Sequence, residues 1–207
     1  NRGNRFDLSS VQPDLGAAGI ELFTADFNGD GLTDMGSFSS LNGRWMTYLN
    51  SGKAQPEFIQ TAELLNFAVG EQIAVTDVNG DGLVDAGFFD AEAGAAYFRC
   101  SRSNSFDDQK NELAFSFHLR GSNVQMQSAD FNGDGVVDFI AYNPFGNSEF
   151  AYSSGIPGDL LIGIDNSISG KTVISYAPST AYSNIYLPFV IPLVSSVEVS
   201  NSRDYAL

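Results

Sequence analysis

The residues best suited to chemistry in this sequence lie in three short acidic segments that repeat one pattern. Residues 26–34, 77–85 and 130–138 each read Asp-x-Asn-x-Asp-Gly-x-x-Asp, with side-chain oxygens at positions 1, 3, 5 and 9. Calcium is a hard cation that takes roughly six to eight oxygen ligands, and helix-flanked calcium loops use the same early positions. A ligand set without histidine or cysteine also excludes a structural zinc site. The sequence therefore predicts three calcium sites.

Each predicted site combines four side chains with the backbone carbonyl of position 7, with a water to complete the shell. The predicted ligands are Asp26, Asn28, Asp30, Leu32 and Asp34 in the first loop, Asp77, Asn79, Asp81, Leu83 and Asp85 in the second, and Asp130, Asn132, Asp134, Val136 and Asp138 in the third. Glycine at position 6 lets the chain reverse through a positive φ. The alternative is an Asx-rich turn without an ion, but three clustered carboxylates without a cation would repel one another.

Short strand-like segments surround each loop. Apolar residues alternate before the loop, and a second apolar run follows it and ends in MGSF, AGFF or FIAY. Two such runs joined by a tight glycine-rich loop predict a hairpin. A third run follows in each repeat, at 44–49, 95–99 and 149–152, and a weaker fourth run at 57–61 and 113–119. Because the residues after the loops are β-branched or aromatic, a helix-flanked calcium hand or dockerin-like module is disfavoured.

The repeat period predicts the architecture. The loops recur at intervals of 51 and 53 residues, and four short strands in that length match one blade of a β-propeller. The predicted fold class is all-β, a partial or small propeller of four-stranded blades with additional strands at the C-terminus. Because the chain begins in mid-blade, its first strand either closes a ring with strands from the C-terminus or belongs to a blade that begins before residue 1. We favour the second alternative and expect earlier blades to precede the chain.

Two regions are expected. Residues 1–155 form the propeller part, with the fourth strand of a preceding blade at 1–19 and three blades that begin near residues 20, 71 and 124. Residues 156–207 lack the acidic loop and form a separate β module. Its strands are expected within 159–165, 172–176 and 187–199.

The overall charge restricts the partners. The 207 residues carry a formal net charge of −15, which would repel nucleic acid and anionic membrane surfaces. Three divalent ions would reduce this to about −9. The longest apolar stretch, 187–194, is short and interrupted by Pro188 and Pro192, so we expect no membrane insertion by this segment. No part of the sequence resembles a signal peptide, so any export signal is expected outside these 207 residues.

The sequence does not favour an enzyme. His118 is the only histidine, and no Gly-x-Ser-x-Gly elbow, phosphate-binding loop or dinucleotide fingerprint is present. We expect His118 on a strand surface and Cys100 as a half-buried apolar residue that forms no intrachain disulfide. Strand aromatics such as Trp45, Tyr48 and Tyr97 are expected in the core more than in a binding patch.

The repeated loops and the strands around them resemble the FG-GAP (VCBS) calcium-binding blades of integrin α-subunit propellers and of many bacterial exported proteins. The segments GKTVISYAPST at 170–180 and LPFVIPLVSSVEV at 187–199 are similar to the segment after the propeller in the B component of bacterial insecticidal toxin complexes and in related plasmid-virulence and Rhs/YD-repeat proteins. These resemblances imply a calcium-binding propeller segment of a secreted or cell-surface bacterial protein. They imply a scaffold and protein-docking role in a toxin-complex-B-like or Rhs-like shell, with another toxin-complex subunit or a host surface protein as partner.

Two other functions are compatible with the sequence. An integrin-like adhesive module would bind a host or matrix protein or a glycan. An accessory domain of an exported hydrolase would owe its activity to another part of the parent protein. The flanking sequence would separate them, since YD repeats, a cell-wall anchor or a catalytic domain would each favour one function.

Overall fold

A computed structural model describes residues 19–53, 57–64, 67–68, 71–102, 105–106, 113–153, 158, 160–166, 170–183 and 186–201. Apart from Gly19, the strand predicted at 1–19 lies outside these residues. The described part consists of antiparallel sheets and one short 3₁₀ turn. This confirms the predicted fold class, an all-β chain of propeller type. No helix among the described residues is long and apolar enough to cross a membrane.

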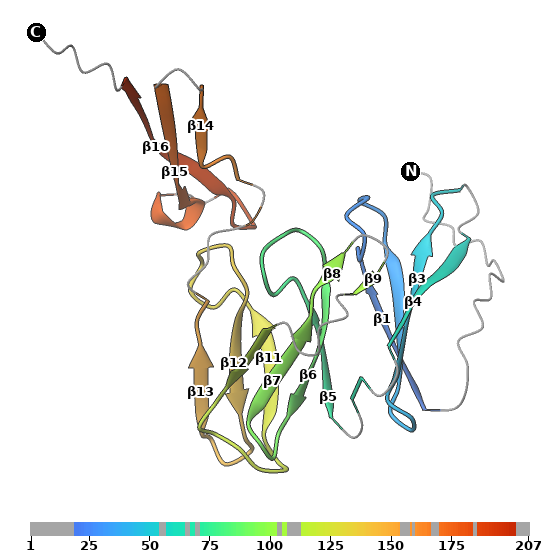
Figure 1. The fold of residues 1–207 in the computed structure, drawn as a ribbon. Coiled ribbons are helices and arrows are strands. Elements are labelled where there is room, and N and C mark those ends of the chain that lie inside the picture. The colour runs from blue at the N-terminus through green and yellow to red at the C-terminus, as the bar shows by residue number, and fades with distance from the viewer. Residues whose placement is uncertain are drawn as a thin grey trace, which may run out of the picture.

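Three sheets stand in a row, and we call them blades 1, 2 and 3 (Figure 1). Consecutive strands are neighbours in each blade. Blade 1 contains β1 (Ile20–Ala25), β2 (Asp34–Ser39), β3 (Arg44–Asn50) and β4 (Phe58–Leu64). Blade 2 contains β5 (Gln72–Thr76), β6 (Asp85–Asp90), β7 (Ala95–Arg99) and β10 (Leu113–Ser116), with a small hairpin of β8 (Ser101–Arg102) and β9 (Ser105–Phe106) between the last two. Blade 3 contains β11 (Gln125–Ala129), β12 (Asp138–Tyr142) and β13 (Ser148–Ala151).

A fourth sheet lies beyond blade 3. It contains β14 (Gly163–Asp165), β15 (Gly170–Pro178) and β16 (Pro192–Asn201), and the 3₁₀ turn η1 (Ser179–Ala181) follows β15. Its register places aliphatic side chains opposite one another on one face, as in the pair Ile174 and Val197, and polar side chains on the other, as in the pair Ser175 and Ser196. The hydroxyl of Thr180 in η1 donates a hydrogen bond to the carbonyl oxygen of Gly133 in the third acidic loop. The sheet is therefore attached to blade 3 at that loop.

Several predicted strand boundaries were wrong. The strand predicted from 113 to 119 ends at Ser116, because the amides of His118 and Leu119 bind the Glu149 carboxylate of blade 3, at 2.8 and 2.9 Å. The strand predicted from residue 187 begins at Pro192. Pro188 has no N–H to give to a ladder, which favours irregular backbone in this segment.

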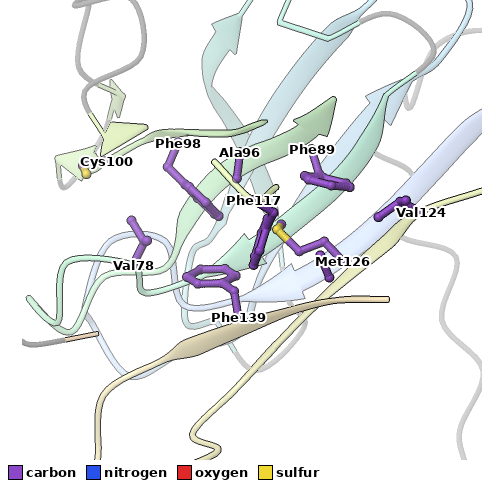
Figure 2. Packing of buried hydrophobic residues seen from close by; sticks show 10 residues of the cluster. Val78, Phe89, Ala96, Phe98, Cys100, Phe117, Val124, Met126 and Phe139 are labelled. Atoms are coloured by element: carbon purple, nitrogen blue, oxygen red, sulfur yellow. The ribbon is translucent and has the colours of Figure 1, made fainter. Parts of the chain in front are cut away.

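The blades pack through two hydrophobic cores. We call the buried cluster between blades 1 and 2 the first interblade core; it contains Phe27, Phe38, Trp45, Phe67, Ala68, Ala86 and Phe106. The second interblade core, between blades 2 and 3, contains Val78, Phe89, Ala96, Phe98, Cys100, Phe117, Val124, Met126, Phe139 and Ala141. Figure 2 shows Phe139 and Met126 of blade 3 beside Phe98 and Phe117 of blade 2. Each blade therefore depends on its neighbour for burial.

Polar contacts supplement these cores. The side-chain amide of Gln72 in blade 2 pairs with the backbone of Met126 in blade 3. Its Nε2 donates to the Met126 carbonyl oxygen and its Oε1 accepts from the Met126 amide, both at 2.9 Å. The amide of Val84 donates to the carbonyl oxygen of Asp26, at 3.1 Å, and so joins the first two acidic loops. These three bonds fix the position of one blade relative to the next.

Glycines make room for the aromatic rings in blades 1 and 2. Gly36 in β2 lies under Trp45, and Gly87 in β6 lies under Phe98, its partner in the ladder. An added Cβ would be 2.5 Å from Trp45 Cζ2 or 2.3 Å from Phe98 Cδ1, closer than any normal contact. The ring thus fills the space that the missing side chain leaves.

We predict that Gly87→Ala lowers the free energy of unfolding by about 1–3 kcal/mol, because the Phe98 ring must move out of a filled core. Gly163→Ala is the matched control, since its Cβ would meet its nearest atom, the Thr172 carbonyl oxygen, at 3.5 Å. The control should stay within about 0.5 kcal/mol of the parent. Urea denaturation followed by circular dichroism measures both, and equal midpoints for the two variants would contradict the prediction.

Candidate metal centre

The first aspartate of each acidic loop organises the loop backbone. Asp26 accepts hydrogen bonds from the amides of Gly29 and Gly31, at 2.7 and 2.8 Å. Both glycines have a positive φ, 77° and 80°, which turns their amides toward the carboxylate. Asp77 and Asp130 make the same pair of bonds to the corresponding glycines of their loops. The position-1 carboxylate is therefore the centre around which each loop closes.

The middle of each loop is a chain of short polar contacts. In the first loop the side-chain oxygen of Asn28 accepts from the Asp30 amide, and its NH₂ group donates to Asp30 Oδ2, both at 3.0 Å. Asp30 Oδ1 accepts from the amide of Leu32, at 2.8 Å. The second and third loops repeat these bonds. Positions 3 and 5 thus lie together in all three loops.

The last aspartate of the pattern lies below the loop and is fully buried. Asp34 accepts one hydrogen bond from the Phe27 amide, at 3.0 Å, and another from the Asn50 amide at the end of β3, at 2.8 Å. Asp85 receives the amides of Val78 and Ser101, and Asp138 those of Phe131 and Ser153, at 2.8–3.0 Å. One carboxylate therefore connects the start of the loop, the second strand and the end of the third strand.

Burial has an electrostatic cost at this position. It raises the pKa of the Asp85 carboxyl to about 7, although the Ser101 and Val78 amides oppose the shift, and the charges of Asp81 and Asp77 add to it. Burial likewise raises the pKa of Asp34. A cation beside these carboxylates would favour their ionised forms.

The donor chemistry fits a hard cation. A carboxylate oxygen has two lone pairs, so an oxygen that accepts one amide N–H keeps a second site for a metal. Positions 1, 3 and 5 and the position-7 carbonyl offer only oxygen ligands, which suits calcium. Among the described residues, however, no group of three or more His, Cys, Asp or Glu side chains is assembled to hold a metal. The structure brings the side chains at positions 3 and 5 together, and it holds the position-9 carboxylate in hydrogen bonds to backbone amides. The complete set of five ligands stays a prediction.

The loops also contact their neighbours. Leu83 of the second loop lies against Gly29 of the first, where an added Cβ would be 2.7 Å from Leu83 Cδ2. A hollow between the second and third loops is lined by residues of both loops and by Gly158. Since the Thr180 hydroxyl binds the third loop, all three loops lie at junctions between sheets. A well-ordered loop backbone therefore helps to hold neighbouring sheets together.

Sequence reasoning missed the partners of the position-9 aspartates. Asn50, Ser101 and Ser153 lie 15 or 16 residues after the aspartate that binds their amides. A small polar residue at the end of the third strand or just after it, in every repeat, was the available signal.

Apolar residues of the loops anchor them to the sheets in part. Position 2 is buried at Phe27 and Val78, and Val84 and Val137 at position 8 pack against the two cores. Phe131, also at position 2, is 42% exposed. An anchor is buried only where a neighbouring blade covers it.

The other residues singled out from the sequence lie as follows. Trp45 and Tyr48 are buried, and Tyr97 stacks on Phe88 with ring centroids 5.1 Å apart. Cys100 is buried in the second interblade core. His118 is exposed, and its Nδ1 lies 2.8 Å from Glu149 Oε1.

Comparisons with known proteins connect this geometry to a family. A family model described as an FG-GAP-like repeat matches residues 26–87. A second model, described as the insecticide toxin TcdB middle/N-terminal region, matches residues 99–204, just over half of the chain. The chain belongs to this TcdB toxin middle/N-terminal family. Both resemblances noted in the sequence are therefore confirmed.

Solved structures with the same fold come from Tc toxins. A Photorhabdus luminescens Tc holotoxin pore with a mutation in TccC3 matches with a TM-score of 0.69 and 19% identity, over 89% of this chain and 9% of that one. TcdB2-TccC3 without its hypervariable C-terminal region matches with a TM-score of 0.68 and 18% identity, again over 89% and 9%. A crystal structure of TcdB2-TccC3 matches with a TM-score of 0.67 and 19% identity, over 89% of this chain and 10% of that one. This chain thus spans about a tenth of the length of each. The comparison with curated proteins gave no match.

We predict that Asp85→Asn lowers the free energy of unfolding by about 1–3 kcal/mol even in the presence of a chelator. Asparagine has one acceptor oxygen, so either the Val78 or the Ser101 amide would be left buried without a partner. Asp81→Asn is the control, because the carbonyl of asparagine can still accept from the Leu83 amide in the open part of the loop. Urea denaturation followed by Trp45 fluorescence measures both. The prediction fails if Asp85→Asn is as stable as Asp81→Asn.

Proposed function

We propose that this chain is a calcium-stabilised propeller segment that serves as scaffold and protein-docking surface within the secreted shell of a Tc-type toxin. The observation that carries the proposal is the position of the three acidic loops. Each loop lies where a hairpin meets a neighbouring sheet, and each carries hard oxygen donors on a backbone that its own hydrogen bonds hold closed. An ion there would act on the connection between sheets.

The charge of the chain supports the calcium part of this proposal. Each loop concentrates three aspartates in nine residues, in a chain whose formal net charge is −15. Burial of Asp85 and Asp34 already works against ionisation. A bound calcium ion supplies positive charge and a coordination shell that neutralises this repulsion. In each loop the position-1 aspartate holds the loop closed, and the position-9 aspartate fixes it against the sheet.

The burial of apolar side chains between the sheets supports the scaffold part of the proposal. Several large aromatic residues of blades 1 and 2, among them Trp45, Phe89 and Phe98, are fully buried between sheets. Family membership and the Tc toxin structures with this fold support assembly with protein partners. The negative charge disfavours nucleic acid as a partner. In this proposal the loops maintain the shape of the segment, and the outer surfaces of the sheets provide its contacts.

We predict that millimolar calcium raises the melting temperature and that a chelator lowers it, with magnesium as the comparison cation. A ligand that binds only the folded state stabilises it by about 2.7 kcal/mol at 100 times its Kd. The double variant Asp77→Ala and Asp81→Ala should lose one of three bound ions, counted by elemental analysis, whereas Glu92→Gln, on an exposed turn, should keep all three. A melting temperature insensitive to calcium and chelator, without metal in the purified protein, would refute the calcium proposal.

A further inference from the structure

The acidic loops share a chemically reactive sequence that does not depend on metal binding. The chain contains four Asn-Gly pairs, and three of them occupy the same place in the loops, with the asparagines at Asn28, Asn79 and Asn132. The backbone nitrogen of a glycine can attack the side-chain carbonyl carbon Cγ of the asparagine before it, because glycine has no Cβ to obstruct the approach. Each loop is therefore a potential site of spontaneous deamidation.

The reaction needs only water and a solvent base. The glycine amide gives its proton to the base, a bond forms between its nitrogen and Cγ, and the side-chain nitrogen takes up a proton and leaves as ammonia. The product is a succinimide ring. Water then opens the ring at Cγ to give aspartate, or at the backbone carbonyl to give isoaspartate.

The closed loop restrains the groups that would react. In the first loop the Gly29 amide donates to Asp26 Oδ1, at 2.7 Å, so a carboxylate holds the proton that must leave. Asn28 Oδ1 accepts from the Asp30 amide and its NH₂ group donates to Asp30 Oδ2, both at 3.0 Å. A hydrogen-bonded amide reacts with solvent base only after its segment opens locally. The rate at each asparagine therefore follows the ease with which its loop opens.

The first loop has the fewest bonds that oppose opening. Among the described residues, Asp26 accepts hydrogen bonds from two loop amides, and Asp77 and Asp130 each accept from three. The additional bond comes from the position-5 amide, at 3.1 Å in both loops. In the third loop the Asn132 amide also donates to Asp138, at 3.2 Å.

The C-terminal part of the chain covers the other two loops at the reactive glycine. Gly158 lies directly against the carbonyl oxygen of Gly80, and the Thr180 hydroxyl donates to the carbonyl oxygen of Gly133. Gly29 instead meets an aliphatic side chain, that of position 7 in the second loop. Gly29 is exposed, whereas Gly80 and Gly133 are half-buried. Hydrogen bonding and cover thus rank the loops in the same order.

We propose that Asn28 is a site of spontaneous deamidation and that the folded protein shields the equivalent Asn79 and Asn132. The product adds a negative charge to the loop, and isoaspartate also lengthens its backbone by a methylene group. Because the Asp26 carbonyl accepts from the Val84 amide, the change occurs where blade 1 is joined to blade 2. The inference concerns the loops without an ion, so it is independent of the calcium proposal.

The fourth Asn-Gly pair supplies an internal reference. Asn42 and Gly43 lie in the turn between β2 and β3, where the Asn42 side chain is exposed and Gly43 is buried. The Gly43 amide donates to the Ser39 carbonyl oxygen, at 2.8 Å, and its carbonyl oxygen accepts from the Phe67 amide, at 2.7 Å. Because both backbone groups of this glycine are bound within blade 1, Asn42 should be modified more slowly than Asn28.

Peptide mapping by mass spectrometry measures the rate at each asparagine. The natural polypeptide that contains these residues is incubated at mildly alkaline pH with a chelator, and deamidated and isoaspartyl peptides are quantified over time. Asn28 should be modified at least about fivefold faster than Asn79, Asn132 and Asn42, the effect of one hydrogen bond on the opening equilibrium.

The same incubation in urea is the control for local sequence. Gly-Asp-Gly follows the asparagine in all three loops, so their rates should become equal once the chain is unfolded. The proposal is overturned by equal rates in the folded protein, by a faster rate at another of the four pairs, by no modification, or by a difference that persists in urea.

Thr180→Val tests the origin of the shielding in the third loop. Valine keeps the shape of the side chain and removes the hydroxyl that binds Gly133. Modification of Asn132 should become about threefold faster or more, with the rates in the other two loops unchanged. Thr61→Val, at an exposed position of β4, is the matched control and should leave all three rates as in the parent. An unchanged rate at Asn132 in the Thr180→Val variant would contradict this account of the shielding.

Discussion

The structure depends first on the need to satisfy three buried carboxylates. A buried charge without partners is strongly unfavourable. Asp34 and Asp85 meet this constraint with two backbone amides each, and Asp138 meets it with three. In each blade at least one amide comes from the loop that precedes the aspartate, and one comes from the end of the third strand or just after it. Three strands are thereby held by one side chain, so a blade can remain ordered although its loop contains little apolar surface.

The same arrangement explains why the acidic loops lie at sheet junctions. The buried aspartate fixes the floor of the loop, and the position-1 aspartate closes its rim through glycine amides. The closed loop then presents backbone groups to its neighbours, such as the Asp26 carbonyl to Val84 and the Gly133 carbonyl to Thr180. Local charge satisfaction and the assembly of sheets are therefore parts of one network, and a cation would act on both.

Local patterns in the sequence were sufficient for much of this fold. Alternation and the repeat period located the hairpins, and the segment 95–99 coincides with β7. What depended on neighbouring sheets could not be predicted. Phe131 has the same loop position as Phe27 and yet is exposed, because burial is decided by the adjacent blade. The second amide at each buried aspartate comes from the end of the third strand or just after it, 15 or 16 residues along the chain. The end of β10 is set by Glu149 of another blade.

The glycine beneath an aromatic ring has a consequence for how such blades can change during evolution. Gly87 and Phe98 lie on different strands but form one complementary shape. Recombination that replaced one of these strands alone would put either two bulky groups or an empty space at the same point. The smallest segment that can be exchanged without disturbing this packing is thus the hairpin that contains both residues. Blade 3 has a different pair, Ile140 and Phe150, at the equivalent position.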